Sequence, residues 1–196
     1  MWLGYAIMKS TSIQKLLSAG NKALANRDFE KARDKFQKAA ATADWSREAL
    51  FGLADSYRGM RRYTEALEVW EQLVEVEPLN QTLLTRAGDT SRNLGELDKA
   101  EQYYRKSLQV GYDLYAKLGL SHIYKIRGDW PKTIGLLEEL LQKEPFNPRI
   151  LEETAFALVK AGNKRKAQEI IDEYLERGGM RSAIKNLLIT LQSEFQ

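Results

Sequence analysis

Near the middle of the chain, an acidic and a basic residue recur together at helical spacing. Asp55 precedes Arg58 by three positions, and Asp89 precedes Arg92 by the same interval, 34 residues further along the chain. Side chains three residues apart are neighbours on a helix, so each pair places a carboxylate beside a guanidinium. Such groups either recognise charged partners through hydrogen bonds and ion pairs or neutralise each other on a solvated surface.

The residues needed for catalysis or metal binding are scarce. His122 is the only histidine, it has no carboxylate motif around it, and the chain contains no cysteine. Disulfides, thiolate metal sites and cysteine nucleophiles are therefore excluded. Gly88 and Gly95, or Gly119 and Gly128, lack the spacing and the Lys-Ser/Thr ending of a phosphate-binding loop. We predict that the protein is not an enzyme and has no metal site and no cofactor.

Composition also bounds the partners and the compartment. The 30 Lys and Arg against 27 Asp and Glu leave a net charge of only +3, which argues against a nucleic-acid partner. The apolar stretch at residues 1–8 ends at Lys9, whereas a membrane-spanning helix needs about 20 apolar residues, so we predict no membrane span. The absence of cysteine favours a cytoplasmic location and is also compatible with a periplasmic one.

A fixed period runs through most of the sequence. Small residues recur at intervals of 34, 34, 33 and 34, and a bulky residue follows each of them by four positions. The small residues are Ala32, Ala66, Ala100, Thr133 and Ala167, and the bulky ones are Phe36, Trp70, Tyr104, Leu137 and Ile171. A period of this length is typical of an array of one supersecondary unit, which presents the same few surface positions in every copy.

Each repeat reads as two amphipathic helices joined by a short turn. Apolar residues recur three and four positions apart, as in Leu50, Leu53, Ala54 and Tyr57. The eighth position of the repeat is always small, which lets two helices approach closely. Its residues are Gly20, Ala54, Gly88, Ser121 and Ala155.

These positions resemble the tetratricopeptide repeat family, most clearly at residues 47–80, where Ala54, Tyr57, Ala66 and Trp70 match the pattern. The resemblance implies an all-α, right-handed α-solenoid of about five stacked helix-turn-helix repeats with a C-terminal capping helix. The expected repeats are 13–46, 47–80, 81–113, 114–147 and 148–181. It also implies that the first helix of each repeat lines a concave groove.

The two ends of the chain are expected to close the array. Residues 1–12 are interpreted as an apolar leader or cap that packs against the first repeat, and residues 182–196 as a capping helix. In the second segment, apolar residues recur at helical spacing, namely Ile184, Leu187, Leu188, Leu191 and Phe195. A covered N-terminal strip favours a monomer over a dimer.

The function that the resemblance implies is a protein–protein interaction scaffold, binding a peptide or a segment of a partner protein in the groove. The candidate groove residues are Asn21, Phe51, Asp55, Arg58, Thr85, Arg86, Asp89, Arg92, Tyr115, His122, Lys125, Arg149 and Phe156. In one reading, basic and aromatic side chains in this set clamp the partner. In the other, the charged pairs solvate the groove and contribute only about 0.2–0.5 kcal/mol each.

Three other functions can be weighed against the sequence. A carrier of a small molecule or lipid, using a pore between repeats, is the main alternative. RNA binding is disfavoured by the low net charge. Family members that hold chaperone C-terminal carboxylates need a five-residue clamp, and over the first three repeats this chain supplies only Asn21 and Arg86 at the required positions.

Changing Arg58, Arg92 and Lys125 together to Glu is expected to abolish capture of the partner. The three new carboxylates would repel the carboxylates of the partner that the basic groups attract. Circular dichroism should show unchanged helicity. The measurement is affinity capture from the native lysate with wild type and variant side by side. Undiminished capture would contradict a binding role for these residues.

Overall fold

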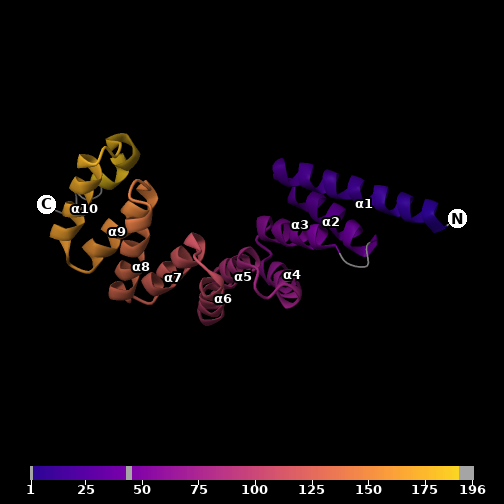
Figure 1. Cartoon of the computed structure of the whole chain (residues 1–196), viewed down its shortest axis with the longest axis horizontal. Helices are drawn as coiled ribbons and strands as arrows, with labels where there is room; N and C mark the ends of the chain where they lie inside the picture. The colour runs from indigo at the N-terminus through magenta and orange to yellow at the C-terminus, as the bar shows by residue number, and fades with distance from the viewer. Residues whose placement is uncertain (1, 43–45, 190–196) are drawn as a thin grey trace. The chain divides into compact units, whose positions relative to one another are not determined.

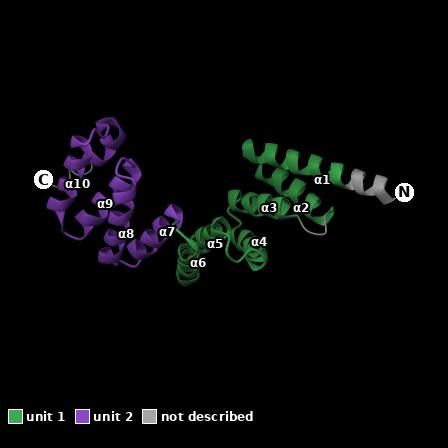
Figure 2. Ribbon diagram, viewed as in Figure 1, with its two compact units in different colours: residues 1–112 green, residues 113–196 purple. Residues whose placement is uncertain are grey.

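The computed structural model describes residues 2–42 and 46–189, and for residues 2–9 only the backbone. Within these ranges all regular secondary structure is helical (Figure 1). The chain divides into two compact parts, unit 1 at residues 1–112 and unit 2 at residues 113–196 (Figure 2). None of the helices in the described part of the chain has the length and apolar content needed to cross a bilayer.

Unit 1 consists of three helical hairpins and unit 2 of two hairpins and a short terminal segment. The helices of unit 1 are α1 (Trp2–Ala25), α2 (Phe29–Thr42), α3 (Arg47–Gly59), α4 (Tyr63–Val76), α5 (Gln81–Asn93) and α6 (Leu97–Val110). Those of unit 2 are α7 (Leu114–Ile126), α8 (Trp130–Lys143), α9 (Pro148–Lys160), α10 (Lys164–Glu176) and the 3₁₀ helix η1 (Arg181–Ile184). Helix-turn-helix repeats predicted from the period are thereby confirmed.

The turn inside each hairpin has one residue in the left-handed conformation. Gly95, Gly128 and Gly162 have φ angles of 82°, 73° and 81°, a region that glycine enters without steric cost. In the first two hairpins Arg27 and Arg61 occupy the same place with φ of 58° and 60°. A side chain there costs about 1–2 kcal/mol, so the turn is held by the hydrogen bonds that close the preceding helix.

The bulky side chain in the middle of each second helix forms the core of its repeat. All five of these residues are at most 1% exposed, namely Phe36, Trp70, Tyr104, Leu137 and Ile171. Phe36 shows why small residues are needed opposite them. A Cβ added at Gly20 of α1 would lie 2.7 Å from the Phe36 ring, and one added at Gly52 of α3 would lie 2.4 Å from it. The ring therefore touches the backbone of both first helices.

The end segments are described only in part. Helix α1 begins at Trp2, so residues 2–12 continue directly into the first hairpin, and the side chains of residues 1–9 lie outside the described set. At the other end, residues 185–189 are helical after η1. Ile184 and Leu187 are buried in one cluster with Leu151 and Tyr174. Leu191 and Phe195 lie outside the described residues, so the full capping helix remains a prediction.

Gly52→Ala is expected to lower the free energy of unfolding by about 1–3 kcal/mol, because the new methyl group would overlap the Phe36 ring. Gly135→Ala in α8 is the matched control. It is exposed with no atom within 4 Å of an added Cβ, so it should stabilise its helix by about 0.5–1 kcal/mol. Urea titration followed by circular dichroism measures both. A gain in stability from both changes would contradict the tight contact at Gly52.

Candidate partner-binding surface

In unit 1, the carboxylate of Asp55 on α3 lies between two guanidinium groups. Arg58 Nε donates to Asp55 Oδ1 at 3.1 Å, and a nitrogen of Arg86 on α5 lies 3.4 Å from the same oxygen. The Asp55–Arg58 pair is the one that the helical spacing predicted. Arg86 adds a link between neighbouring repeats. Two guanidiniums around one carboxylate leave hydrogen-bond donors that a partner can use.

The ring of Phe51 lies next to this charged group. It packs edge-on against Trp70 with a centroid distance of 4.8 Å. The guanidinium carbons of Arg47 and Arg86 lie 6.0 and 5.9 Å from its centroid, at the outer limit of a cation–π contact. Arg86 therefore contacts both the carboxylate of Asp55 and the aromatic ring.

The second predicted pair of unit 1 is looser. An Arg92 nitrogen lies 3.9 Å from Asp89, which is an ion pair but no hydrogen bond. Asp89 instead accepts a hydrogen bond of 2.7 Å from the buried Tyr104 hydroxyl. Burial first, and then Asp89, raise the pKa of Tyr104, so the phenol stays a donor. The Asp89 carboxylate is thus tied to the core of its own repeat.

Two further candidates of unit 1 differ in their access to solvent. Asn21 is exposed, and its amide donates to Glu48 on α3 at 3.2 Å. Thr85 is buried, and its hydroxyl lies 3.3 Å from the hydroxyl of Ser107 on α6. Thr85 therefore offers little surface to a partner, because the fifth position of this repeat faces the second helix.

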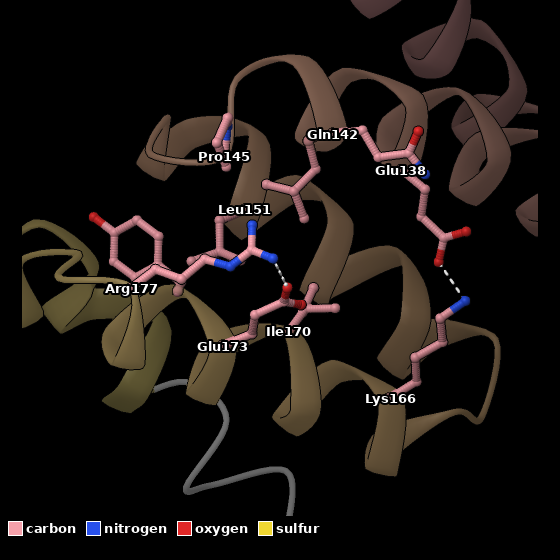
Figure 3. Close-up of a pocket in the computed structure, with 10 residues that line it drawn as sticks. Glu138, Gln142, Pro145, Leu151, Lys166, Ile170, Glu173 and Arg177 are labelled. Carbon is pink, nitrogen blue, oxygen red and sulfur yellow. Dashed lines mark ion pairs between the residues drawn. The ribbon is translucent and has the colours of Figure 1, made fainter.

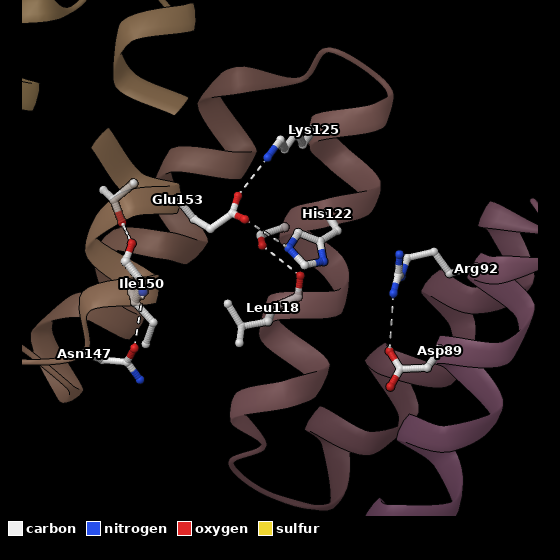
Figure 4. Close-up of polar contacts among 10 residues, drawn as sticks. Asp89, Arg92, Leu118, His122, Lys125, Asn147, Ile150 and Glu153 are labelled. Carbon is white, nitrogen blue, oxygen red and sulfur yellow. Dashed lines mark hydrogen bonds and ion pairs between the residues drawn. The ribbon is translucent and has the colours of Figure 1, made fainter. Parts of the chain in front are cut away.

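In unit 2, the carboxylate of Glu153 on α9 joins two candidates on α7 (Figure 4). Lys125 Nζ donates to it at 2.8 Å, and His122 Nε2 lies 3.8 Å away, an ion pair when the imidazole is protonated. His122 first, and Lys125 with it, hold the pKa of Glu153 at about 2, against burial, which acts in the opposite direction. Glu153 is therefore a fixed negative charge at neutral pH.

Phe156 lies next to this cluster and remains 36% exposed. Lys125 Nζ lies 4.5 Å and Lys160 Nζ 5.5 Å from the centroid of its ring. A shallow pocket of about 270 Å³ opens here. Its lining consists of Lys125, Glu152, Glu153, Phe156, Asn186 and Leu187. The remaining candidates of this unit, Tyr115 and Arg149, are both exposed.

Sequence reasoning did not single out Glu153, although a signal for it exists. Asp55 pairs with Arg86, and His122 pairs with Glu153. Both pairs join residues 31 positions apart, the ninth position of one repeat and the sixth of the next. Testing the charges at this offset would have found the second pair.

The five helical hairpins in the described ranges, with functional candidates concentrated on their first helices, define a tandem-repeat protein of the α-helical class. Models of the family described as tetratricopeptide repeat match residues 51–115 and again residues 126–188. The chain belongs to the tetratricopeptide repeat family. This family is generally non-enzymatic, and membership supports a role as a protein–protein interaction scaffold.

Individual relatives are distant. The chain is 24% identical over 163 residues to heat shock protein STI1 of Saccharomyces cerevisiae, covering 77% of this chain and 28% of that protein. It spans less than a third of the length of the curated relatives it matches. Crystal structures of MamA and of a tetratricopeptide repeat protein from Thermus thermophilus share the fold. MamA has a TM-score of 0.75 at 17% identity, with 90% of this chain and 96% of MamA covered. The Thermus protein has 0.65 at 20% identity, with 93% and 98% covered.

Glu153→Gln is expected to lower the free energy of unfolding at pH 7 by about 1–3 kcal/mol. Because the folded pKa of Glu153 is lowered from 4.5 to about 2, its contribution is complete above pH 4.5 and is lost as the pH falls toward 2. Wild type and variant should therefore converge across this window in urea titrations. Glu152→Gln controls for removing one carboxylate. A difference that stays constant from pH 7 to pH 2 would show that charge is not the cause.

Proposed function

We propose that the protein is an adaptor that binds an extended segment of a partner protein along the first helices of its repeats. The observation that carries this proposal is the partly exposed ring of Phe156, which lines a pocket and has the ammonium groups of Lys125 and Lys160 close to it. Partly exposed aromatic rings with charged neighbours are common anchors of protein interfaces.

The chemistry of the surface suggests what such a segment carries. Phe51 in unit 1 and Phe156 in unit 2 each have two cationic groups near the ring. An apolar side chain of the partner would cover the ring and exclude water, and a nearby carboxylate would approach the cations. The carboxylates of Asp55 and Glu153 would repel a misplaced acidic group and so orient the segment.

The alternative function, a carrier of a small molecule or lipid, has one observation in its favour. A pocket of about 390 Å³ lies between α8 and α10, near the lower end of the range for ligand sites. A ligand that copurifies with the protein would support this alternative. The low net charge continues to argue against RNA, and a monomer in the cytoplasm remains the prediction.

Truncating an exposed ring tests the proposal more cleanly than reversing charges. Arg58 and Lys125 are ion-paired with Asp55 and Glu153, so a change to Glu at either position would break a pair within the protein as well as alter the surface. Phe156 is accessible, and a change to Ala at this position leaves the ion pairs in place.

Phe156→Ala is expected to weaken binding of a peptide selected on the wild-type protein from a displayed random library by about 10- to 100-fold. Helicity should not change. Phe146→Ala is the matched control, since Phe146 is 54% exposed and lies in the turn between α8 and α9. Isothermal titration calorimetry measures both variants. Equal losses from the two changes, or no loss from the first, would overturn the proposed surface.

A further inference from the structure

The surface around Phe156, Lys125 and Glu153 is called the Phe156 surface. A separate pocket lies between the second helices α8 and α10 (Figure 3). Its apolar lining includes Leu141, Leu151 and Ile170. An ion pair stands at each end of it. Lys166 Nζ lies 2.5 Å from Glu138 Oε1 at one end, and Arg177 lies 2.7 Å from Glu173 at the other. The pocket thus combines apolar surface with charges at defined places.

The same place in unit 1 is filled by a side chain of the protein itself. Glu71 on α4 and Lys99 on α6 pair at 2.8 Å, and each lies 67 positions before its counterpart, Glu138 or Lys166. Tyr103 stands 67 positions before Ile170. Its ring packs against the core of unit 1, and its hydroxyl donates to Glu71 at 2.7 Å.

The hydrogen bond from Tyr103 satisfies Glu71. Against burial, which acts in the opposite direction, Lys99 and Tyr103 together lower the pKa of Glu71. Burial first, and then Glu71, raise the pKa of Tyr103, so the phenol keeps its proton and remains a donor. A carboxylate, an ammonium group and a phenol therefore form a complete set between α4 and α6.

In unit 2 this set lacks the phenol. Ile170 has neither a ring nor a hydroxyl group, and the space that a ring would fill is open. Glu138 Oε1 is paired with Lys166, whereas its counterpart Glu71 Oε1 is paired with Lys99 and also accepts from the Tyr103 hydroxyl. A carboxylate oxygen can accept a second hydrogen bond, as Glu71 Oε1 does, so a ligand that supplies a phenol donor is favoured at Glu138.

We propose that the pocket between α8 and α10 binds a tyrosine side chain of a partner protein, with its ring against Leu141 and Ile170 and its hydroxyl donating to Glu138. Tyr103 is the template for this arrangement within the same chain. The volume of about 390 Å³ leaves room for chain atoms beside the ring. The Arg177–Glu173 pair at the far end offers polar groups to the neighbouring residues of the partner. Both features favour a protein segment over a free phenol.

The probes are N-acetyl-tyrosinamide, N-acetyl-phenylalaninamide and p-cresol, each titrated into the 15N-labelled full chain. N-acetyl-tyrosinamide should give saturable shifts confined to amides of α8, α9 and α10. The phenylalanine compound should bind about tenfold more weakly, because it cannot donate to Glu138. Equal affinity of these two compounds overturns the role of Glu138. If p-cresol binds as tightly as N-acetyl-tyrosinamide, the site takes a free phenol and the partner-protein assignment is overturned.

Three variants locate the site. Ile170→Tyr should fill the pocket in the manner of Tyr103 and abolish the shifts, while Tyr103→Ile should open the counterpart between α4 and α6 to the tyrosine probe. Glu138→Gln should reduce the preference for tyrosine over phenylalanine. If shifts are absent in the wild type, or persist in Ile170→Tyr, the proposal fails. Should Tyr103→Ile fail to fold, Ile170→Tyr alone decides the outcome.

The Phe156 surface and this pocket are separable in the same experiment. Phe156 does not line the pocket, so Phe156→Ala should leave the shifts caused by N-acetyl-tyrosinamide unchanged. Loss of these shifts in that variant would mean that the probe binds at the surface proposed for the adaptor function, and it would contradict the separate site.

Discussion

The close contact between the bulky side chain of each second helix and the small residues of the first helices is the constraint on which the repeat depends. Phe36 touches the backbone at both Gly20 and Gly52, and Tyr104 approaches Gly88 in the same way, at 2.7 Å from where a Cβ would lie. Close packing of this kind fixes helix spacing, because neither ring nor backbone can yield without a loss of contacts. This constraint explains why small and bulky residues recur with a fixed period in the sequence.

A fixed spacing between first helices also fixes which of their side chains can meet. The ninth position of one repeat reaches the sixth position of the next, as in Asp55 with Arg86 and His122 with Glu153. In the first pair the carboxylate comes from the earlier repeat, and in the second it comes from the later one. The contact between the ninth and the sixth position is therefore repeated, but the acidic and basic residues change places. The two units thus present their charges differently on the same arrangement of helices.

The fold was predictable from the sequence because packing positions repeat. The hairpins and the intrahelical Asp55–Arg58 pair followed from spacing alone. The left-handed conformation of Arg27 and Arg61 did not, because arginine rarely adopts it and no glycine marks these two turns. The burial of Thr85 was missed because groove positions were assigned from the family resemblance, and its environment depends on Ser107 of the neighbouring helix.

Sites between repeats were harder to predict than sites within one. Glu153 acquires its partners only across the interface of α7 and α9, at an offset that no local pattern contains. The pocket beside Ile170 arises because one repeat has isoleucine where another has the larger tyrosine. An apolar residue at a packing position is ordinary, so nothing in the sequence alone indicates a pocket there. The correspondence between Tyr103 and Ile170 emerges only when the repeats are aligned, because the two residues lie 67 positions apart.

In an array of this kind, a partner is recognised at the positions where the repeats differ from one another in residue type. The positions that set helix spacing cannot vary without loss of stability, as the contact between Phe36 and Gly52 requires. The positions between neighbouring second helices tolerate Tyr103 in one case and Ile170 in another, because an open space on the surface costs less than a cavity in the core. Where the chain supplies its own phenol, the carboxylate of Glu71 accepts a hydrogen bond from Tyr103 of the same chain. Where it does not, Glu138 has Lys166 beside it but no phenol donor, and the proposed tyrosine of a partner would supply that donor without any change in the backbone of the repeat.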